Sequence, residues 1–361
     1  MPDITLQTLS ATETPALWGL SPYLTRWMLY QRFVNGVDLA QGEDARMAWG
    51  KKLQPLVIAQ AADELGLKVE PNLGHVYRRR GRLGCTRDAT IFCPDRGRGA
   101  LETKCVFDYA TWMRDWDGGR NVPPMHEIQL QQQMKVGDAG GSYQWGVIAV
   151  WVAGDQYYFE REPFHEFWRL LDQEVETFFA AVASKSEPDP SGSPVEVPWL
   201  ARLFPTVKRK QLDLSQDPSA GTIAEKVSLY KTLAAQESGA KRAKETLRAE
   251  LLALAKDHEV IALPRGIKVR VSTRSIAEQA RKASVSKTLT VTVPDEVGAA
   301  APSKVGGNGG AGWRQNHSAA ADAAFAVMAT QHRRDHASPD RAGRDADRSR
   351  ARRPDTCGRS G

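Results

Sequence analysis

Two charged residues, Glu102 and Lys104, lie inside an apolar segment of the chain. The residues that flank them on both sides are apolar, as in a strand buried within a sheet: Ala100, Leu101, Cys105 and Val106. Residues two positions apart in a strand point to the same face, so Glu102 and Lys104 would project together. Charges at such a position need partners, because burying them alone is costly. The segment therefore predicts a strand that carries a polar site on one face.

A second acidic residue, Asp88, belongs with this pair. The segment Gly84–Asp88 is typical of a turn that leads into a strand, and it lies about fourteen residues before Glu102. If the two strands are neighbours, Asp88 meets Glu102 and Lys104. Two converging carboxylates form a hard oxygen site that suits Mg²⁺ or Mn²⁺. A lysine beside them can hold or deprotonate a water molecule, or neutralise charge in a transition state.

Helical and strand patterns alternate along the first half of the chain, which predicts an α/β fold with a central mixed sheet flanked by helices. Ser21-Pro22 would open the first helix, and Pro55 predicts a kink or a break near Leu53 in the second. The expected helices cover residues 23–33, 43–65, 108–116, 125–136 and 163–183. The expected strands cover residues 75–79, 89–92, 99–106, 143–152 and 156–160.

The second half of the chain differs in composition. Residues 187–221 begin with a stretch rich in Pro, Ser and acidic residues and are expected to form a linker after a core of residues 1–186. Residues 222–292 predict a helical hairpin or short coiled coil, interrupted at Ser238-Gly239, and a small β-hairpin. Residues 293–361 contain mainly Ala, Gly, Arg and Asp and are expected to be disordered.

Composition gives only a weak functional signal. The chain has 361 residues and a net charge of +6, but residues 301–361 alone contain eleven Lys or Arg and six Asp. The remaining residues are therefore close to neutral, and a basic total confined to a tail says little about the folded part. The four cysteines show no Cys-x-x-Cys spacing, and no apolar run is long enough for a membrane span. We expect a cytoplasmic protein.

Four segments resemble the YqaJ viral recombinase family, which includes lambda-type phage exonucleases within the PD-(D/E)xK nuclease superfamily. The segments are Met47–Pro55, Gly84–Asp88, Leu101–Cys105 and Gln129–Met134. The resemblance covers about residues 9–180. It implies a restriction-endonuclease-like core and hydrolysis of phosphodiester bonds in linear duplex DNA, from the 5′ end towards the 3′ end, in phage-type homologous recombination.

The resemblance also implies roles for single residues. Asp88 and Glu102 would be ligands of Mg²⁺ (or of Mn²⁺ as a substitute), with the carbonyl oxygen of Thr103 completing the set. Lys104 would be the catalytic lysine. Two glutamines of the helical segment would face the site, close to the scissile phosphate, and a hydroxyl near the chain start would lie near the DNA end: Gln129, Gln131 and Thr12.

This sequence departs from the family pattern at three places. Gln54 stands where the family usually has Glu, and the lost charge would weaken a second metal site or slow the chemistry. Arg87 replaces the Pro that usually precedes the catalytic Asp, which adds a candidate phosphate contact. No basic residue precedes Arg26, so the lambda-type contact to a 5′-terminal phosphate has no counterpart.

A run of arginines precedes the proposed site: Arg78, Arg79, Arg80 and Arg82. These side chains could follow the DNA backbone towards Asp88, because phosphate contacts supply most sequence-independent affinity. The alternative is a solvated strand end and turn, and the short distance to Asp88 favours DNA contact. The tryptophans of the core are expected to pack in the interior rather than stack on bases: Trp112, Trp116, Trp145 and Trp151.

By resemblance, the expected partners are double-stranded DNA ends, a single-strand annealing protein and two further copies of the chain in a homo-trimer, in a bacterial host cell. Two other functions stay open. One is a structure-specific endonuclease on the same core. The other is a catalytically weak DNA-binding recombination protein, in which Gln54 marks lost chemistry. Retention of Asp88, Glu102 and Lys104 together argues against the second.

Overall fold

A computed structural model of the chain describes residues 8–37, 44–72, 77–204, 212–256, 258–262 and 268–271. The expected disordered tail, residues 293–361, lies outside the described residues, as does most of the accessory region after residue 271. The first compact unit of the chain extends through Leu200, and a second begins at Ala201.

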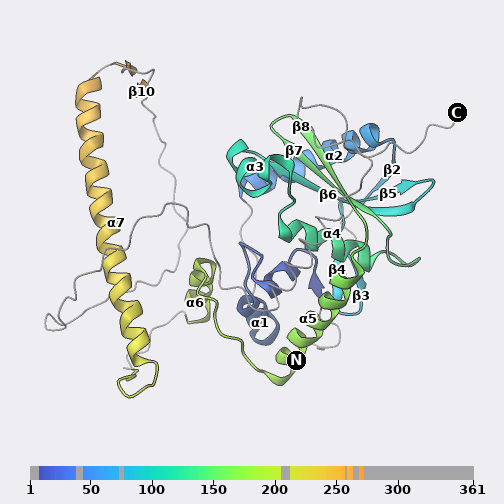
Figure 1. Ribbon diagram of the computed structural model, residues 1–361, viewed down its shortest axis with the longest axis horizontal. Coiled ribbons are helices and arrows are strands. Elements are labelled where there is room, and N and C mark those ends of the chain that lie inside the picture. The colour runs from blue at the N-terminus through green and yellow to red at the C-terminus, as the bar shows by residue number, and fades with distance from the viewer. Residues whose placement is uncertain are drawn as a thin grey trace, which may run out of the picture. The chain divides into compact units, whose positions relative to one another are not determined.

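The centre of the first unit is a mixed sheet, as the sequence predicts (Figure 1). It has five strands, and its edge strand, residues 68–71, was not expected from the sequence. Strands β6 and β7 are parallel and the other neighbouring pairs are antiparallel. In spatial order the strands are β2 (Lys68–Pro71), β5 (Ala89–Cys93), β6 (Gly97–Val106), β7 (Gly146–Val152) and β8 (Asp155–Arg161). The longest strand, β6, lies in the middle and carries the Glu-Thr-Lys motif.

Helices cover both faces of this sheet. Helix α2 (Ala45–Leu65) packs on one face, where its apolar residues join Leu101 in one hydrophobic cluster. Helix α4 (Pro124–Val136) packs on the other face, in the larger cluster that includes Ala100. Because residues alternate along β6, Glu102 lies on the α4 side, with Ala100.

Further elements surround α4. The cluster on that side also takes in α1 (Arg26–Asn35), the short 3-10 helix η2 (Thr14–Trp18), α3 (Tyr109–Asp115) and α5 (His165–Ser184). A second 3-10 turn, η3 (Asp117–Gly119), follows α3. Trp112, Trp116 and Trp145 are buried, which confirms the expected core packing, and Trp151 is partly buried against the core.

A small three-stranded sheet joins the beginning of the chain to the approach to Asp88. Strand β1 (Leu9–Ser10) pairs in parallel with β4 (Leu83–Cys85), and β3 (Arg78–Arg80) pairs antiparallel with β4. The expected strand at residues 75–79 is thus described from Tyr77 onward, and β3 itself begins at Arg78.

Helices α1 and α2 differ from the sequence prediction. Helix α1 begins at Arg26, because the side chain of Thr25 accepts a hydrogen bond from the Met28 amide and caps it. Ser21 instead caps a turn before the helix. Helix α2 continues through Pro55 without a break.

The expected linker begins with residues that pack on the core. The 3-10 turn η4 (Pro194–Glu196) and helix α6 (Val197–Leu203) follow α5. Glu196 is buried and accepts a hydrogen bond from Thr25 at 2.6 Å, and Trp199 is buried as well. The first unit therefore extends through Leu200, fourteen residues beyond the predicted boundary at residue 186.

The second unit contains one long helix, α7 (Ala220–Ala255), where the sequence predicted a helical hairpin. The hairpin prediction is wrong because Gly239 costs a helix only about 1 kcal/mol, which 36 residues of continuous helix tolerate. Strands β9 (Val260–Ala262) and β10 (Lys268–Arg270) form the expected small antiparallel hairpin. No helix in the described part of the chain is both long and apolar enough to cross a membrane.

Candidate active site

Asp88 stands directly before β5, and β5 pairs with β6, so the two acidic segments are neighbours as the sequence predicted. The register Ala89↔Leu101 brings Asp88 beside Glu102 and Thr103. Asp88 Oδ2 accepts hydrogen bonds from the backbone amide of Thr103, at 2.7 Å, and from its hydroxyl, at 2.5 Å. Thr103 thus holds the Asp88 carboxylate against β6.

Glu102 is only 3% exposed, and three side chains donate hydrogen bonds to its carboxylate. The Lys104 ammonium and the Gln129 amide both donate to Oε1, the latter at 2.6 Å. The Gln133 amide donates to Oε2 at 2.6 Å. Burial of the carboxyl group, followed by the nearby charge of Asp88, raises the pKa of Glu102 to about 7. Lys104 and the hydrogen bond from Gln133 oppose this shift.

Lys104 connects the strand to helix α4. Its Nζ also donates a hydrogen bond to Gln129 Oε1 at 3.0 Å, and its side chain remains one-fifth exposed. Lys104 can therefore reach a ligand while two partners fix its position. The convergence of Asp88, Glu102 and Lys104 that the sequence predicted is present.

Gln131 does not face this site, and that part of the prediction is wrong. Its amide donates to the Glu162 carbonyl at 2.9 Å, and its Oε1 accepts from the Phe164 amide and from the Trp168 indole. These bonds hold the start of α5. Residues two apart on a helix are turned about 200° from each other, which explains why Gln129 and Gln131 point to different partners.

Gln133 is the site residue that the sequence analysis missed. It lies four positions after Gln129, one helical turn along α4, and residues with this spacing lie on the same face. That spacing is visible in the sequence and could have found it. Gln132 points elsewhere, donating to the carbonyls of Leu9 and Gly84 at 3.0 and 2.8 Å.

Gln54 lies half-buried on α2, one turn before Ile58. Within the described ranges, no hydrogen bond joins its side chain to Asp88, Glu102 or Lys104. Its expected effect on a second metal site stays a prediction.

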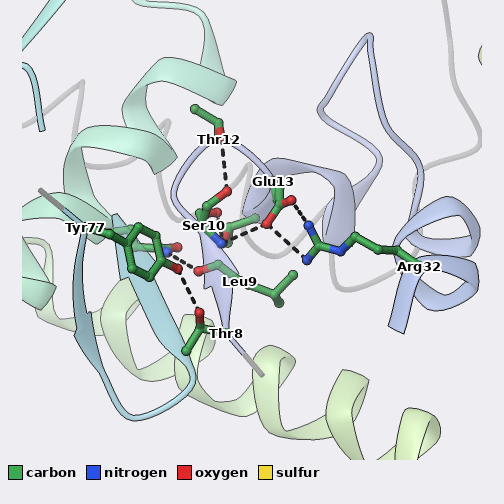
Figure 2. Close-up of polar contacts among 9 residues, drawn as sticks. Thr8, Leu9, Ser10, Thr12, Glu13, Arg32 and Tyr77 are labelled. Atoms are coloured by element: carbon green, nitrogen blue, oxygen red, sulfur yellow. Dashed lines mark hydrogen bonds and ion pairs between the residues drawn. The ribbon is translucent and has the colours of Figure 1, made fainter. Parts of the chain in front are cut away.

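The turn that contains Thr12 is fixed by its neighbours (Figure 2). Glu13 forms an ion pair with Arg32 and also accepts a hydrogen bond from the Ser10 amide at 2.9 Å. Thr12 itself is exposed, and its hydroxyl lies 3.1 Å from that of Ser10. Among the described residues, no hydrogen bond links Thr12 to Asp88, Glu102 or Lys104, so its role at a DNA end stays a prediction.

The side chain of Tyr77 lies directly over Gly84, close to the start of β1. The Tyr77 hydroxyl lies 2.8 Å from the Thr8 hydroxyl. A side chain on Gly84 would place its Cβ 1.8 Å from the Tyr77 hydroxyl oxygen, so only glycine allows this close approach.

The five candidate DNA-binding arginines have different surroundings. The three of β3 are exposed, and Arg80 donates to the Ser142 hydroxyl at 2.6 Å. Arg82 instead lies near Glu176 of α5, at 3.7 Å, with its guanidinium over the Phe179 ring. Arg87 is buried, donates to the Gly137 carbonyl at 2.6 Å and lies over the Tyr143 ring.

The oxygen atoms near Lys104 fit a hard divalent cation. The described part of the chain has no group of three or more His, Cys, Asp or Glu side chains arranged for a metal. The acidic ligands available at this site are therefore two, Asp88 and Glu102. Mg²⁺ commonly binds through one or two carboxylates and keeps several waters. Gln133 Oε1 is buried beside Glu102 and accepts no hydrogen bond in the described ranges, and a hydrated cation supplies donors for such an acceptor.

Residues 3–140 match the family model of the YqaJ-like viral recombinase domain. This segment of the chain is similar to a YqaJ-like viral recombinase domain. The YqaJ-like domain contains Asp88, Glu102 and Lys104, together with the α4 glutamines that contact Glu102. The comparison with curated proteins finds no match.

The chain is also similar to solved exonuclease structures. The alkaline exonuclease LHK-Exo from Laribacter hongkongensis is 19% identical, with a TM-score of 0.40, and 55% of this chain covers 94% of that one. A phage-related exonuclease from Haemophilus somnus 129PT is 13% identical, with a TM-score of 0.37, and 49% of this chain covers 92% of it. Similarity at this level assigns no residue roles within the YqaJ-like domain.

Proposed function

We propose that this chain is a metal-dependent DNA exonuclease that hydrolyses phosphodiester bonds of linear duplex DNA. The observation that supports this most directly is the convergence of Asp88, Glu102 and Lys104 at one point of the central sheet, inside the YqaJ-like domain. An arrangement of two carboxylates and a lysine on adjacent strands suits hydrolysis of a phosphodiester.

The metal in this proposal is Mg²⁺, with Mn²⁺ as a substitute. Asp88, Glu102 and the Thr103 carbonyl would hold it, because all three are hard oxygen donors. When bound, the cation neutralises charge on the scissile phosphate and lowers the pKa of a water molecule.

The side chains around Glu102 then have separate tasks. Lys104, fixed by Glu102 and Gln129, presents its ammonium to the phosphate and stabilises the negative charge that develops there. Gln129 and Gln133 fix the orientation of the Glu102 carboxylate from helix α4. In the reaction, the water oxygen bonds to phosphorus and the bond to O3′ breaks. One hydrogen of the water stays on the new phosphate oxygen and the other ends on O3′.

The finer parts of the proposal follow the family resemblance alone. These are cleavage from the 5′ end, cooperation with a single-strand annealing protein, assembly as a homo-trimer and action in the cytoplasm of a bacterial host. The absence of a basic residue before Arg26 makes recognition of a 5′-terminal phosphate the part with least support in the sequence.

Digestion of linear duplex DNA tests the function. The DNA is labelled separately at each 5′ and 3′ end and incubated with Mg²⁺, Mn²⁺ or EDTA, beside a covalently closed circle. We expect metal-dependent release of the 5′ label as a mononucleotide, with no cleavage of the circle. Lys104→Ala should abolish release, and Lys241→Ala, on exposed helix α7, should preserve it.

Other outcomes identify the alternatives. Discrete fragments, or cleavage of the circle, would show an endonuclease instead. DNA binding without cleavage in either metal would overturn the enzymatic proposal. Gln54→Glu would then show whether the departure in α2 is the cause, because it restores the charge that the family usually has there.

A further inference from the structure

A cavity of about 780 Å³ lies beside the candidate active site. Its floor includes side chains from three neighbouring strands of the central sheet: Glu70, Thr90 and Arg98. Its wall is the connection from α4 to β7, residues 138–144, and Arg87. Arg87 immediately precedes the proposed metal ligand Asp88.

The cavity floor lies on the same face of the sheet as the active site. Arg98 and Glu102 are four residues apart on β6, so they point to the same side, about 13 Å from each other along the strand. A DNA strand whose scissile phosphate lies at Glu102 would carry its second phosphate along the chain at about this distance. The cavity is thus within reach of the same substrate strand.

Two of the four arginines that line the cavity form ion pairs with carboxylates, and two do not. Arg98 contacts Asp138 at 3.1 Å and Glu70 at 3.5 Å, and Arg96 contacts Glu160 at 2.6 Å. The other two arginines of the lining, Arg78 and Arg87, form no ion pair with a carboxylate in the described part of the chain. The cavity therefore carries an excess of positive charge.

Arg87 is the strongest sign that an anion belongs here. It is only 6% exposed, and its partners are all uncharged: the Gly137 carbonyl at 2.6 Å, the Cys85 sulfur at 4.0 Å and the Tyr143 ring. A buried charge without a counter-ion is unfavourable, and a guanidinium has five donors, more than these partners use. An anion in the cavity would supply the missing counter-ion and accept hydrogen bonds from the unused donors.

We propose that this cavity binds a backbone phosphate of the DNA substrate, away from the scissile bond, through Arg87 with Arg78 and Arg98. The planar guanidinium group matches the geometry of phosphate oxygens. The inference rests on the proposed function for the source of the phosphate. The same chemistry would accept a free phosphate, so the test separates the two sources.

The first measurement is thermal unfolding of the full chain with inorganic phosphate, and separately with a short single-stranded DNA in EDTA. We expect DNA to raise the Tm of the wild-type protein more than inorganic phosphate does. In Arg87→Met the Tm without ligand should equal or exceed that of wild type, because an uncompensated buried charge is removed, and the DNA-induced rise should be lost. A purely structural Arg87 would instead lower the Tm without ligand and leave the DNA-induced rise intact.

The second measurement is DNA affinity in EDTA at several salt concentrations, with variants of opposite charge. Arg98→Gln should weaken binding about three- to tenfold and reduce the slope of log K against log salt by about 0.7–0.9, the value for one phosphate contact. Glu70→Gln, at an exposed position, should strengthen binding. Arg169→Gln, on the exposed side of α5, is the matched control and should change neither value.

The outcomes are distinguishable from those of the nuclease test. Wild-type binding and digestion by Arg87→Met, Arg98→Gln and Glu70→Gln would overturn the cavity proposal and leave the exonuclease proposal standing. If the protein cleaves no DNA, and Arg87→Met and Arg98→Gln lose DNA affinity while Glu70→Gln gains it, the exonuclease proposal is overturned and the cavity proposal stands. Stabilisation by inorganic phosphate but not by DNA would show a free-anion site and overturn the assignment to the substrate strand.

Discussion

The side-chain amide of Gln133 donates a hydrogen bond to the carboxylate of Glu102, 2.6 Å away. Together with Gln129, it makes α4 the support of the most buried acidic group in the candidate site. These hydrogen bonds distinguish the glutamines of α4 that position Glu102 from those that stabilise only the fold.

Replacing Gln133 by Ala should remove the donor of a buried carboxylate. Loss of a hydrogen bond to a charged group costs about 1.5–3 kcal/mol, so we expect the free energy of unfolding in urea to fall by that amount. Nuclease activity should fall as well, and higher Mg²⁺ should partly restore it. Unchanged stability and activity would show that the bond contributes nothing.

Gln131→Ala should have the opposite balance of effects. It removes three hydrogen bonds at the start of α5, each worth about 1 kcal/mol, so stability should drop by about 2–3 kcal/mol. The kcat below the melting transition should stay within about twofold of wild type. A large loss of kcat in a still-folded Gln131→Ala protein would show that Gln131 does contribute to the active site.

His126 should make the stability of the fold depend on pH. Its ring is partly buried, with Nδ1 enclosed, and is stacked on Trp116; desolvation, followed by the charge of Lys104, lowers the pKa of His126 well below the usual value. Below pH 6.5, His126 therefore takes up a proton in the unfolded chain but stays neutral in the folded chain. Stability is complete above that pH and falls by about 1.4 kcal/mol per pH unit below it.

The comparison of wild type with His126→Phe isolates this contribution, because the carboxylates titrate in both proteins. Chemical unfolding measured from pH 7.5 to pH 5 should show a shallower loss of stability in the variant. Parallel curves would mean that His126 takes up its proton in the folded state.

Gly137 should not tolerate a side chain. Its φ is +54°, and an added Cβ would lie 1.9 Å from the Gly141 carbonyl oxygen. Gly137→Ala should cost about 2 kcal/mol or more in thermal unfolding, since strain and collision both oppose it. Gly50→Ala, in helix α2 with open space around it, should instead gain about 0.5–1 kcal/mol.

The parts of the fold that the sequence predicted depend on local patterns. The apolar residues around Glu102 and Lys104 predicted β6, and the turn before Asp88 predicted its entry into β5. The linker prediction was wrong at residues 187–200, because Glu196 is buried through a bond to Thr25, 171 residues away. Such a partner leaves no signature in the local composition of an acidic, proline-rich segment.

The α4 glutamines show the same limit at the scale of the site. All of them look alike in the sequence, and the helical period alone groups Gln129 with Gln133. Which group faces Glu102 depends on the rotation of α4 on the sheet, which tertiary packing determines. The surroundings of Arg87 were equally hidden, because its partner Gly137 is 50 residues away.

The bond between Gln132 and the Leu9 carbonyl spans 123 residues and helps hold the parallel pair of β1 with β4. During synthesis, β1 leaves the ribosome long before β4 and α4 exist. Because parallel pairing of distant segments has to await loop closure, β1 should be among the last strands of this unit to dock. The turn with Thr12 would therefore acquire its ordered form only after the helix that positions Glu102 has folded, so a truncated nascent chain would lack this end of the domain.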